Sequence, residues 1–228
     1  MKKIILSTLF IGFSIISNAQ VSKGTLAIGG QIGLSFESSK NKSTFGAVTT
    51  ETDGPAITKF SILPAVQYFV IDKFSIGINV GYQLSSSYQK STSTFGGTSF
   101  EVTNSSGAFV VAPFARYYYM LSENFGFFGQ AAVPLMFGTN TTISKSGSTS
   151  VTTDLPYSSF GFQLTPGIVF FPTKKIGIEA TLGNIFAIQA QTVATSKNPD
   201  ASYTKTNIDL FNVNTFGFNM GFFYYFAK

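Results

Sequence analysis

Three segments of this chain alternate, residue by residue, between large apolar side chains and small or polar ones. They cover residues 24–36, 74–84 and 216–226. In the second segment, isoleucine, valine, tyrosine and leucine at even positions alternate with serine, glycine, asparagine and glutamine at odd positions. Successive side chains of a β-strand point to opposite faces, whereas a helix would place apolar residues three and four positions apart. The alternation therefore predicts strands with one apolar face and one small or polar face.

The small fraction of charged residues in the chain indicates where the apolar face points. Charged residues make up 11% of the chain, while phenylalanine supplies 26 residues and tyrosine 10. Globular proteins average about 25% charged residues, and a soluble surface this poor in charge would favour association. A barrel whose outer face meets acyl chains has no such need for charge. The basic residues form no patch interleaved with aromatic ones, so nucleic acid is not an expected partner.

The start of the chain has the layout of a secretory signal peptide. Two lysines precede an apolar stretch over residues 4–16, and small residues up to Ala19 follow where a signal peptidase would cleave. The apolar stretch is shorter than the roughly 20 residues that a membrane-spanning helix needs. We therefore expect residues 1–19 to be a cleaved signal peptide and residues 20–228 to form one outer-membrane barrel domain.

A hairpin unit occurs three times. A segment with a proline at its second position and aromatic residues at its end is followed each time by a short turn and a new alternating stretch. The segments are residues 63–69, 112–118 and 165–171, and the turns are residues 71–73, 121–124 and 172–175. Proline cannot donate a hydrogen bond to a neighbouring strand. We therefore expect Pro64, Pro113 and Pro166 at bulges or at the barrel rim.

Stretches rich in serine, threonine, glycine and asparagine separate the hairpins. They cover residues 37–56, 89–104, 139–156 and 191–207. Loops this long are uncommon in compact soluble domains, whereas outer-membrane barrels combine short turns at one end with long loops at the other. We expect strands near residues 24–36, 57–70, 74–88, 105–119, 124–138, 157–171, 176–190 and 208–226. The predicted fold is all-β: an eight-stranded antiparallel up-and-down transmembrane β-barrel with short periplasmic turns, long extracellular loops and both chain ends in the periplasm.

The hairpin copies, the short and long connections and the last strand resemble the small outer-membrane β-barrel family of Gram-negative bacteria, which includes OmpX and the transmembrane domain of OmpA. The resemblance covers residues 20–228. In the last strand, Gly221, Tyr224 and Phe226 look like the signal by which such proteins are recognised for membrane insertion, although two further residues follow the final aromatic one here. The resemblance implies an outer-membrane location, contact with lipid and lipopolysaccharide, recognition by the assembly machinery through the C-terminal strand, and a monomer.

The chain lacks the residue types that most enzyme and metal sites use, because it contains no histidine and no cysteine. Serine needs a base within hydrogen-bond reach to act as a nucleophile, and transition metals favour imidazole and thiolate ligands. Glu179 is the one acidic residue well inside a predicted strand, so no carboxylate pair is expected for acid–base catalysis. Glu51 and Asp53 lack the spacing of a calcium-binding loop. We therefore expect no enzyme activity, no cofactor and no metal site.

A polar cluster is expected inside the barrel. Arg116 lies shortly before one turn and Glu179 shortly after another, and both have the inward parity. Charges in a confined interior must be paired to be tolerated, so these two are expected to meet near the periplasmic end. The full expected cluster is Lys59, Gln67, Asn79, Arg116, Gln130 and Glu179. It is either a structural plug or a gate in a small pore, and the narrow interior of an eight-stranded barrel favours the plug.

Aromatic residues are expected in two belts, because their amphipathic rings favour both lipid–water boundaries. The belt at the turn end is expected to contain Tyr68, Phe74, Tyr117, Tyr118, Tyr119 and Phe125, and the belt toward the loops Tyr82, Tyr88 and Tyr157.

Three functions are open at this point. The first is a passive envelope scaffold whose surface loops contact a partner outside the cell. The second is a porin-like channel for small or apolar solutes. The third is a soluble secreted ligand-binding barrel like the lipocalins, which would direct its apolar residues inward. The small and polar inward parity favours the first two.

Overall fold

The computed structural model describes residues 21–45, 48–92, 99–194, 202–210 and 216–226. The predicted signal peptide lies outside these residues. The described residues form the strands β1 (Leu26–Phe45), β2 (Val48–Ile71), β3 (Phe74–Thr92), β4 (Ser99–Met120), β5 (Phe125–Ala132), β6 (Leu135–Ser146), β7 (Thr149–Thr173), β8 (Ile176–Leu182), β9 (Phe186–Ala194), β10 (Ser202–Leu210) and β11 (Phe216–Phe226). In this part of the chain, no helix is long and apolar enough to cross a membrane.

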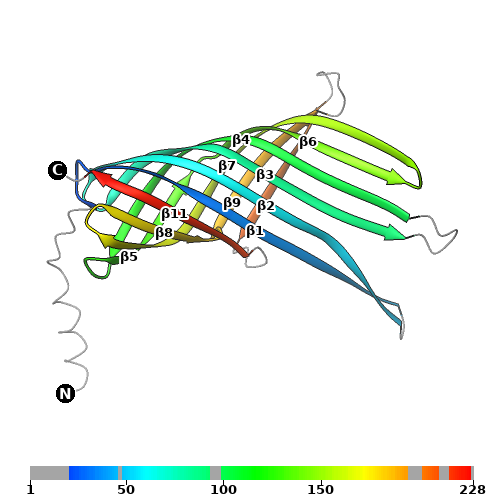
Figure 1. The fold of residues 1–228 in the computed structure, drawn as a ribbon, viewed down its shortest axis with the longest axis horizontal. Helices are drawn as coiled ribbons and strands as arrows, with labels where there is room; N and C mark the ends of the chain where they lie inside the picture. Colours follow the sequence, from blue (N-terminus) through cyan, green and yellow to red (C-terminus); the bar gives the residue numbers. More distant parts are fainter. Residues whose placement is uncertain (1–20, 46–47, 93–98, 195–201, 211–215, 227–228) are drawn as a thin grey trace, which may run out of the picture.

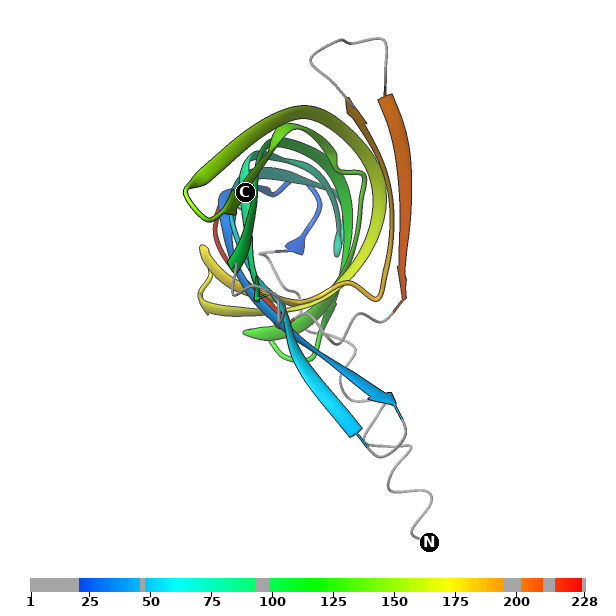
Figure 2. The same ribbon diagram turned by 90° about the vertical axis from the view of Figure 1, so that its right-hand side faces the viewer.

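The strands pair in chain order, and the ring closes between the first strand and the last. β1 pairs antiparallel with β2 and with β11, so Leu26 lies opposite Tyr68 on one side and Phe226 on the other. Around the ring, β1, β2, β3 and β4 follow one another, and β5 and β6 together occupy the next place. After them come β7, then β8 and β9 together, and finally β11. Figure 2 shows this ring around its lumen. The expected eight-stranded antiparallel up-and-down barrel is confirmed.

Three of the eight expected strands are each divided in two. β5 and β6 are separated by Val133 and Pro134, and β8 and β9 by residues 183–185. Gly183 has a φ of 56°, a left-handed conformation that glycine adopts without strain. The last expected strand, residues 208–226, overlaps the end of β10, which begins earlier at Ser202 and pairs with β9, and contains β11, which pairs with β1 and β8. β5 and β6 both pair with β4 and β7, and β8 and β9 both pair with β7, so the breaks leave the ring order intact.

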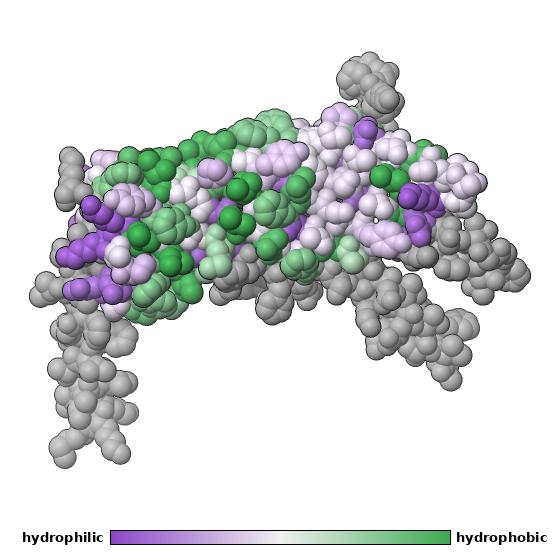
Figure 3. All heavy atoms as spheres, in the orientation of Figure 1, coloured by the Kyte–Doolittle hydropathy of each residue, from purple (hydrophilic) through white to green (hydrophobic). Residues whose placement is uncertain are grey.

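Apolar side chains point outward and polar ones point inward. On β3, Ile76, Ile78 and Val80 are 49%, 41% and 37% exposed, whereas Ser75 and Asn79 are buried. The outward apolar side chains form a band between the hydrophilic turn end and the paler part of the surface farther along (Figure 3). The lipocalin-like alternative, which requires the apolar face inside, is therefore wrong.

The stretches expected to be long loops are mostly strand. Two residues separate β1 from β2 and two separate β6 from β7, while β3 continues to Thr92 and β4 begins at Ser99. Figure 1 shows the paired strands extending past the barrel wall, away from the short turns. The prediction of long loops is wrong for a physical reason. Strands with water on both faces need no apolar alternation, so serine- and threonine-rich ribbons look like loops in the sequence.

Each repeated proline lies within a strand, beside an interruption in one of the two ladders of that strand. Pro113 pairs with Ile78 and Pro166 with Gly129, and the register between β2 and β3 is the same before and after Pro64. The register shifts of β2 against β3 and of β7 against β8 lie beside the short turns. The expected irregularity is found at Pro166, where the register of β7 shifts by two residues between its pairing with β9 and with β8, whereas the expectation is wrong for Pro64 and Pro113, which interrupt a ladder without shifting its register.

Candidate functional site

Arg116 of β4 and Glu179 of β8 meet inside the barrel, as the sequence predicts. Nη1 of Arg116 donates to Oε1 and Oε2 of Glu179 at 2.8 and 2.7 Å. Both side chains are completely buried, with 0% exposure. β4 and β8 are not neighbours in the ring, so this ion pair crosses the lumen.

The other polar atoms of Arg116 also have partners. Nε and Nη2 donate to Oε1 of Gln130 at 3.1 and 2.7 Å, and Nη1 donates to the hydroxyl of Tyr118 at 2.9 Å. The guanidinium carbon lies 4.3 Å from the ring centroid of Phe128, a distance typical of a cation–π contact. The N–H groups of the guanidinium have acceptors, and its flat face packs against the ring of Phe128. The buried cation is therefore held in one position.

The carboxylate of Glu179 is held from further strands. The hydroxyls of Tyr118 and Tyr225 each donate to its Oε1 at 3.2 Å. Gln67 donates to the hydroxyl of Tyr118 at 3.1 Å and accepts from Ser75 at 3.0 Å. We call this set the plug network: Gln67, Ser75, Arg116, Tyr118, Gln130, Glu179 and Tyr225. Its members come from β2, β3, β4, β5, β8 and β11, so one polar network joins strands all round the barrel.

Apolar side chains fill the rest of the lumen at the turn end. Phe69, Phe171 and Phe223 are buried around the plug network, together with Val21, which precedes β1. The backbone N–H of Lys73 donates to the carbonyl of Val21 at 2.6 Å, which ties the start of the described chain to the first turn. The described residues thus form a packed core, and the lumen is blocked at this level.

The structure brings together only some of the expected cluster. Gln67 and Gln130 join Arg116 and Glu179, whereas Lys59 and Asn79 line a cavity farther from the turns. Tyr118, expected in the turn-end belt, is instead fully buried and belongs to the plug network. Ser75 and Tyr225 also belong to the network, although neither is among the residues expected there. The alternation of side chains along each strand could have identified both tyrosines as inward-facing. Tyr118 lies two residues after the inward Arg116, and Tyr225 lies between the outward Tyr224 and Phe226.

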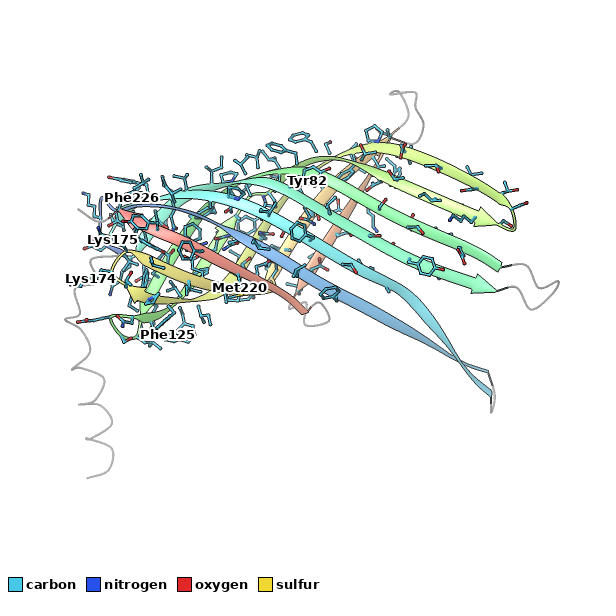
Figure 4. All side chains as sticks on the ribbon, viewed as in Figure 1. Tyr82, Phe125, Lys174, Lys175, Met220 and Phe226 are labelled. Carbon is cyan, nitrogen blue, oxygen red and sulfur yellow. The ribbon has the colours of Figure 1, made fainter. Side chains whose placement is uncertain are left out.

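The remaining aromatic residues of the expected belts occupy the outer surface with one exception. Tyr68, Tyr117 and Tyr119 are exposed near the turns, and Tyr82 and Tyr88 are exposed farther along the wall. Phe74 and Phe125 are partly exposed. Figure 4 shows Phe125 and Phe226 near Lys174 and Lys175 at the turn end, with Tyr82 far from them. The exception is Tyr157, which is buried and shares a 3.0 Å hydrogen bond with Ser106.

A cavity of about 370 Å³ occupies the lumen beyond the plug network. It is lined from all sides of the ring, from Gln130 and Thr181 beside the plug network to Asp209 on β10. Within the described residues, no three His, Cys, Asp or Glu side chains are grouped closely enough to hold a metal ion. The lining thus offers hydrogen-bonding groups and not a metal centre.

The expected insertion signal lies at the end of β11 nearest the turns. Gly221 is opposite Gln31 on β1 and Glu179 on β8. The rings of Tyr224 and Phe226 point outward and contact each other edge to face, with centroids 4.8 Å apart. Recognition of these residues by an assembly machinery stays a prediction.

The ring of Phe128 depends on a glycine in the neighbouring strand. A Cβ added at Gly167 would lie 2.6 Å from Cε2 of Phe128, whereas one added at Gly129 would meet nothing within 4 Å. We expect Gly167→Ala to lower the free energy of unfolding by about 1–3 kcal/mol, because the displaced ring also packs on Arg116. Gly129→Ala is the matched control and should be neutral or slightly stabilising. Urea unfolding of both variants in detergent measures the difference, and equal stabilities would contradict the proposed packing.

Sequence comparison gives no assignment, because no protein-family model and no curated protein matches the chain. Solved structures of similar fold include the outer membrane protein OprG from Pseudomonas aeruginosa, with 12% identity over 92% of this chain and 99% of that one and a TM-score of 0.43. The N-terminal β-barrel domain of Pseudomonas aeruginosa OprF has 10% identity over 90% and 98%, with a TM-score of 0.36. Ail, the attachment invasion locus protein of Yersinia pestis, has 11% identity over 90% and 99%, with a TM-score of 0.33.

Likeness at these identities concerns the fold alone, and the argument for the architecture comes from the chain itself. Its strands close into a ring, its apolar side chains point outward, and its buried polar groups meet in the lumen. The chain is an eight-stranded antiparallel β-barrel with apolar side chains on its outer face and a polar network in its lumen.

Proposed function

We propose that this protein spans the outer membrane as a closed barrel and acts as a passive envelope scaffold whose projecting strands contact a partner outside the cell. The observation that carries the proposal is the plug network, in which a fully buried ion pair crosses the lumen between β4 and β8. A lumen closed by charge-paired and aromatic side chains has no continuous aqueous path for solutes. The protein would then act through its surfaces.

The proposed orientation places the short turns and both chain ends in the periplasm. The start of β1 pairs with the end of β11, so the two ends lie on the same side as the turns. Residues 1–19 would direct export and be removed, and the barrel formed by residues 20–228 would insert through the signal at Gly221, Tyr224 and Phe226. The outward apolar band would contact lipid and lipopolysaccharide around a monomer. No cofactor or enzymatic activity is part of this proposal.

Conductance of the purified protein in a planar bilayer tests the closed lumen. We expect no stable single-channel current from the wild type, because the ion pair and the aromatic residues around it fill the barrel at the turn end. Arg116→Ala should lower stability without producing a current, since Phe114, Phe128 and Phe223 would still occupy that level. A steady current from the folded wild type would contradict the scaffold proposal.

The alternative proposal is a channel for small or apolar solutes, and the cavity beyond the plug network favours it. A solute that enters this cavity would cross only if Arg116 and Glu179 moved apart. Liposome swelling with uncharged solutes of graded size distinguishes the two functions. Rapid, size-dependent swelling would support transport, and swelling no faster than that of empty liposomes supports the scaffold.

A further inference from the structure

Two buried polar atoms in the lumen have no hydrogen-bond partner. In the described part of the chain they are Oγ of Ser35 on β1 and Oδ1 of Asn79 on β3. Both residues line the 370 Å³ cavity, and Asn79 is only 4% exposed. A buried polar atom that lacks a partner costs stability, so such atoms usually indicate a bound molecule or ordered water. Both residues line the cavity, but the two atoms have less than 1 Å² of accessible surface, so each side chain would have to turn for its oxygen to meet a ligand.

The cavity has the size and lining of a ligand site. Its volume lies within the range of about 300–1,000 Å³ that small-molecule pockets occupy. Its wall carries many side-chain amides, among them Gln31, Gln83, Gln163, Asn184, Gln189 and Asn219. An amide presents a donor and an acceptor side by side, and Ser35, Ser61 and Thr165 add hydroxyls that do both. Such a surface matches a molecule whose own groups both donate and accept.

Charge argues against an ionic ligand. Among the described residues of the lining, Lys59 and Asp209 are the only charged ones, and they have opposite signs. Lys59 already takes part in an interaction of its own. At the floor of the cavity, the charges of Arg116 and Glu179 compensate each other. A charged ligand would lose hydration without gaining a committed counterion. An apolar ligand would leave the polar atoms of Ser35 and Asn79 unsatisfied.

We propose that this cavity binds a small, uncharged, polyhydroxylated solute, toward which the side chains of Asn79 and Ser35 turn their unpartnered oxygens as anchors. A hydroxyl group of such a solute supplies the donor that Asn79 requires. The hydroxyl groups on adjacent carbons can each donate a hydrogen bond to the surrounding amides and accept one from them. The plug network closes the floor, so the solute enters and leaves from the side away from the turns. The site is thus a blind pocket that binds without transport.

Titration of the mature chain, folded in detergent micelles, tests the proposal with three sugars that differ in charge. The probes are D-glucose, the cation D-glucosamine and the anion D-gluconate, and the readout is the NMR signals of the Asn79 and Ser35 amides. We expect saturable shifts with D-glucose, with a dissociation constant on the order of 1 mM for a ligand of this size. Both charged sugars should bind more weakly. Tighter binding of gluconate or glucosamine would overturn the proposal in favour of an ion site at Lys59 or Asp209.

Variants locate the binding site. Asn79→Leu removes the unpaired acceptor at similar volume and should weaken D-glucose binding about tenfold, while the fold is retained because no hydrogen bond of that oxygen is lost. Ser35→Ala should weaken binding severalfold and serves as a second variant if Asn79→Leu does not fold. Ser158→Val, on the outward face of β7, is the matched control and should bind as the wild type does. Absence of saturable binding, or equal affinity in Asn79→Leu, would show that the cavity holds water only and would overturn the proposal.

Discussion

Glu179→Ala is expected to lower the free energy of unfolding by about 3–5 kcal/mol, because removing one partner of a buried ion pair leaves the other charge unpaired. Arg116 would keep Gln130 and Tyr118 as acceptors but would lose the carboxylate that compensates its charge. Urea titration of the folded protein in lipid vesicles measures the change, with the loss of tertiary structure followed by near-ultraviolet circular dichroism of the tyrosines.

The matched control replaces both charges with apolar residues. Arg116→Met combined with Glu179→Leu should regain most of the stability lost in Glu179→Ala, because buried ion pairs often have apolar substitutes of similar stability. Recovery will be incomplete, since the hydroxyl of Tyr225 loses its acceptor in the double variant. A double variant no more stable than Glu179→Ala would indicate that the unpaired charge is not the cause of the loss.

The second large effect concerns the outward face of β3. If the apolar band meets acyl chains, Val80→Arg places a charge near the middle of the bilayer and should lower stability by about 2–4 kcal/mol. Val80 lies on the outward face between Ile78 and Tyr82, all of them exposed in the isolated chain. On a water-facing surface, the same substitution would change stability by no more than about 0.5 kcal/mol.

Ser86→Arg is the control for Val80→Arg. Ser86 has the same outward parity on the same strand, three alternations farther from the turns. Its substitution should lower stability by no more than about 1 kcal/mol, because Ser86 lies between the outward Tyr82 and Tyr88 of the loop-side belt, where a charge is near the lipid–water boundary. The folded fraction in vesicles can be read by electrophoresis of unheated samples, since a folded barrel migrates differently from the boiled chain. Equal effects of the two substitutions would contradict the proposed membrane boundary.

The ring of eight strands was predictable from the sequence because lipid and lumen impose opposite chemistry on alternate residues. The pattern is clearest on β3, where isoleucine and valine alternate with serine, glycine and asparagine, and the structure places each set as expected. The pattern fails where that contrast is absent. Beyond the apolar band both faces of a strand meet water, so the ends of β1, β4, β6 and β7 carry no alternation and were taken for loops.

Half of the lumen site was predictable for a similar reason. A buried charge requires a partner, so Arg116 and Glu179 could be paired from their parity and their distances from the turns. The tyrosines were harder to place. A tyrosine suits both a membrane interface and a buried network, and only the inward parity of Tyr118 and Tyr225 separates these roles. The positions of Lys59 and Asn79 relative to the plug network depend on strand tilt and stagger, which the sequence does not encode locally.

In the proposed orientation, the projecting strands set how far the protein extends from the cell. β7 has 25 residues. At about 3.3 Å per residue and a tilt near 40°, crossing an apolar band of about 25 Å uses roughly 10 residues, so the tip stands about 40 Å above it. A hydrogen-bonded ribbon of that height reaches beyond the lipid headgroups as an ordered surface. A molecule approaching from outside would therefore meet a preformed array of serine and threonine hydroxyls, and binding it would require less loss of chain entropy than ordering a loop.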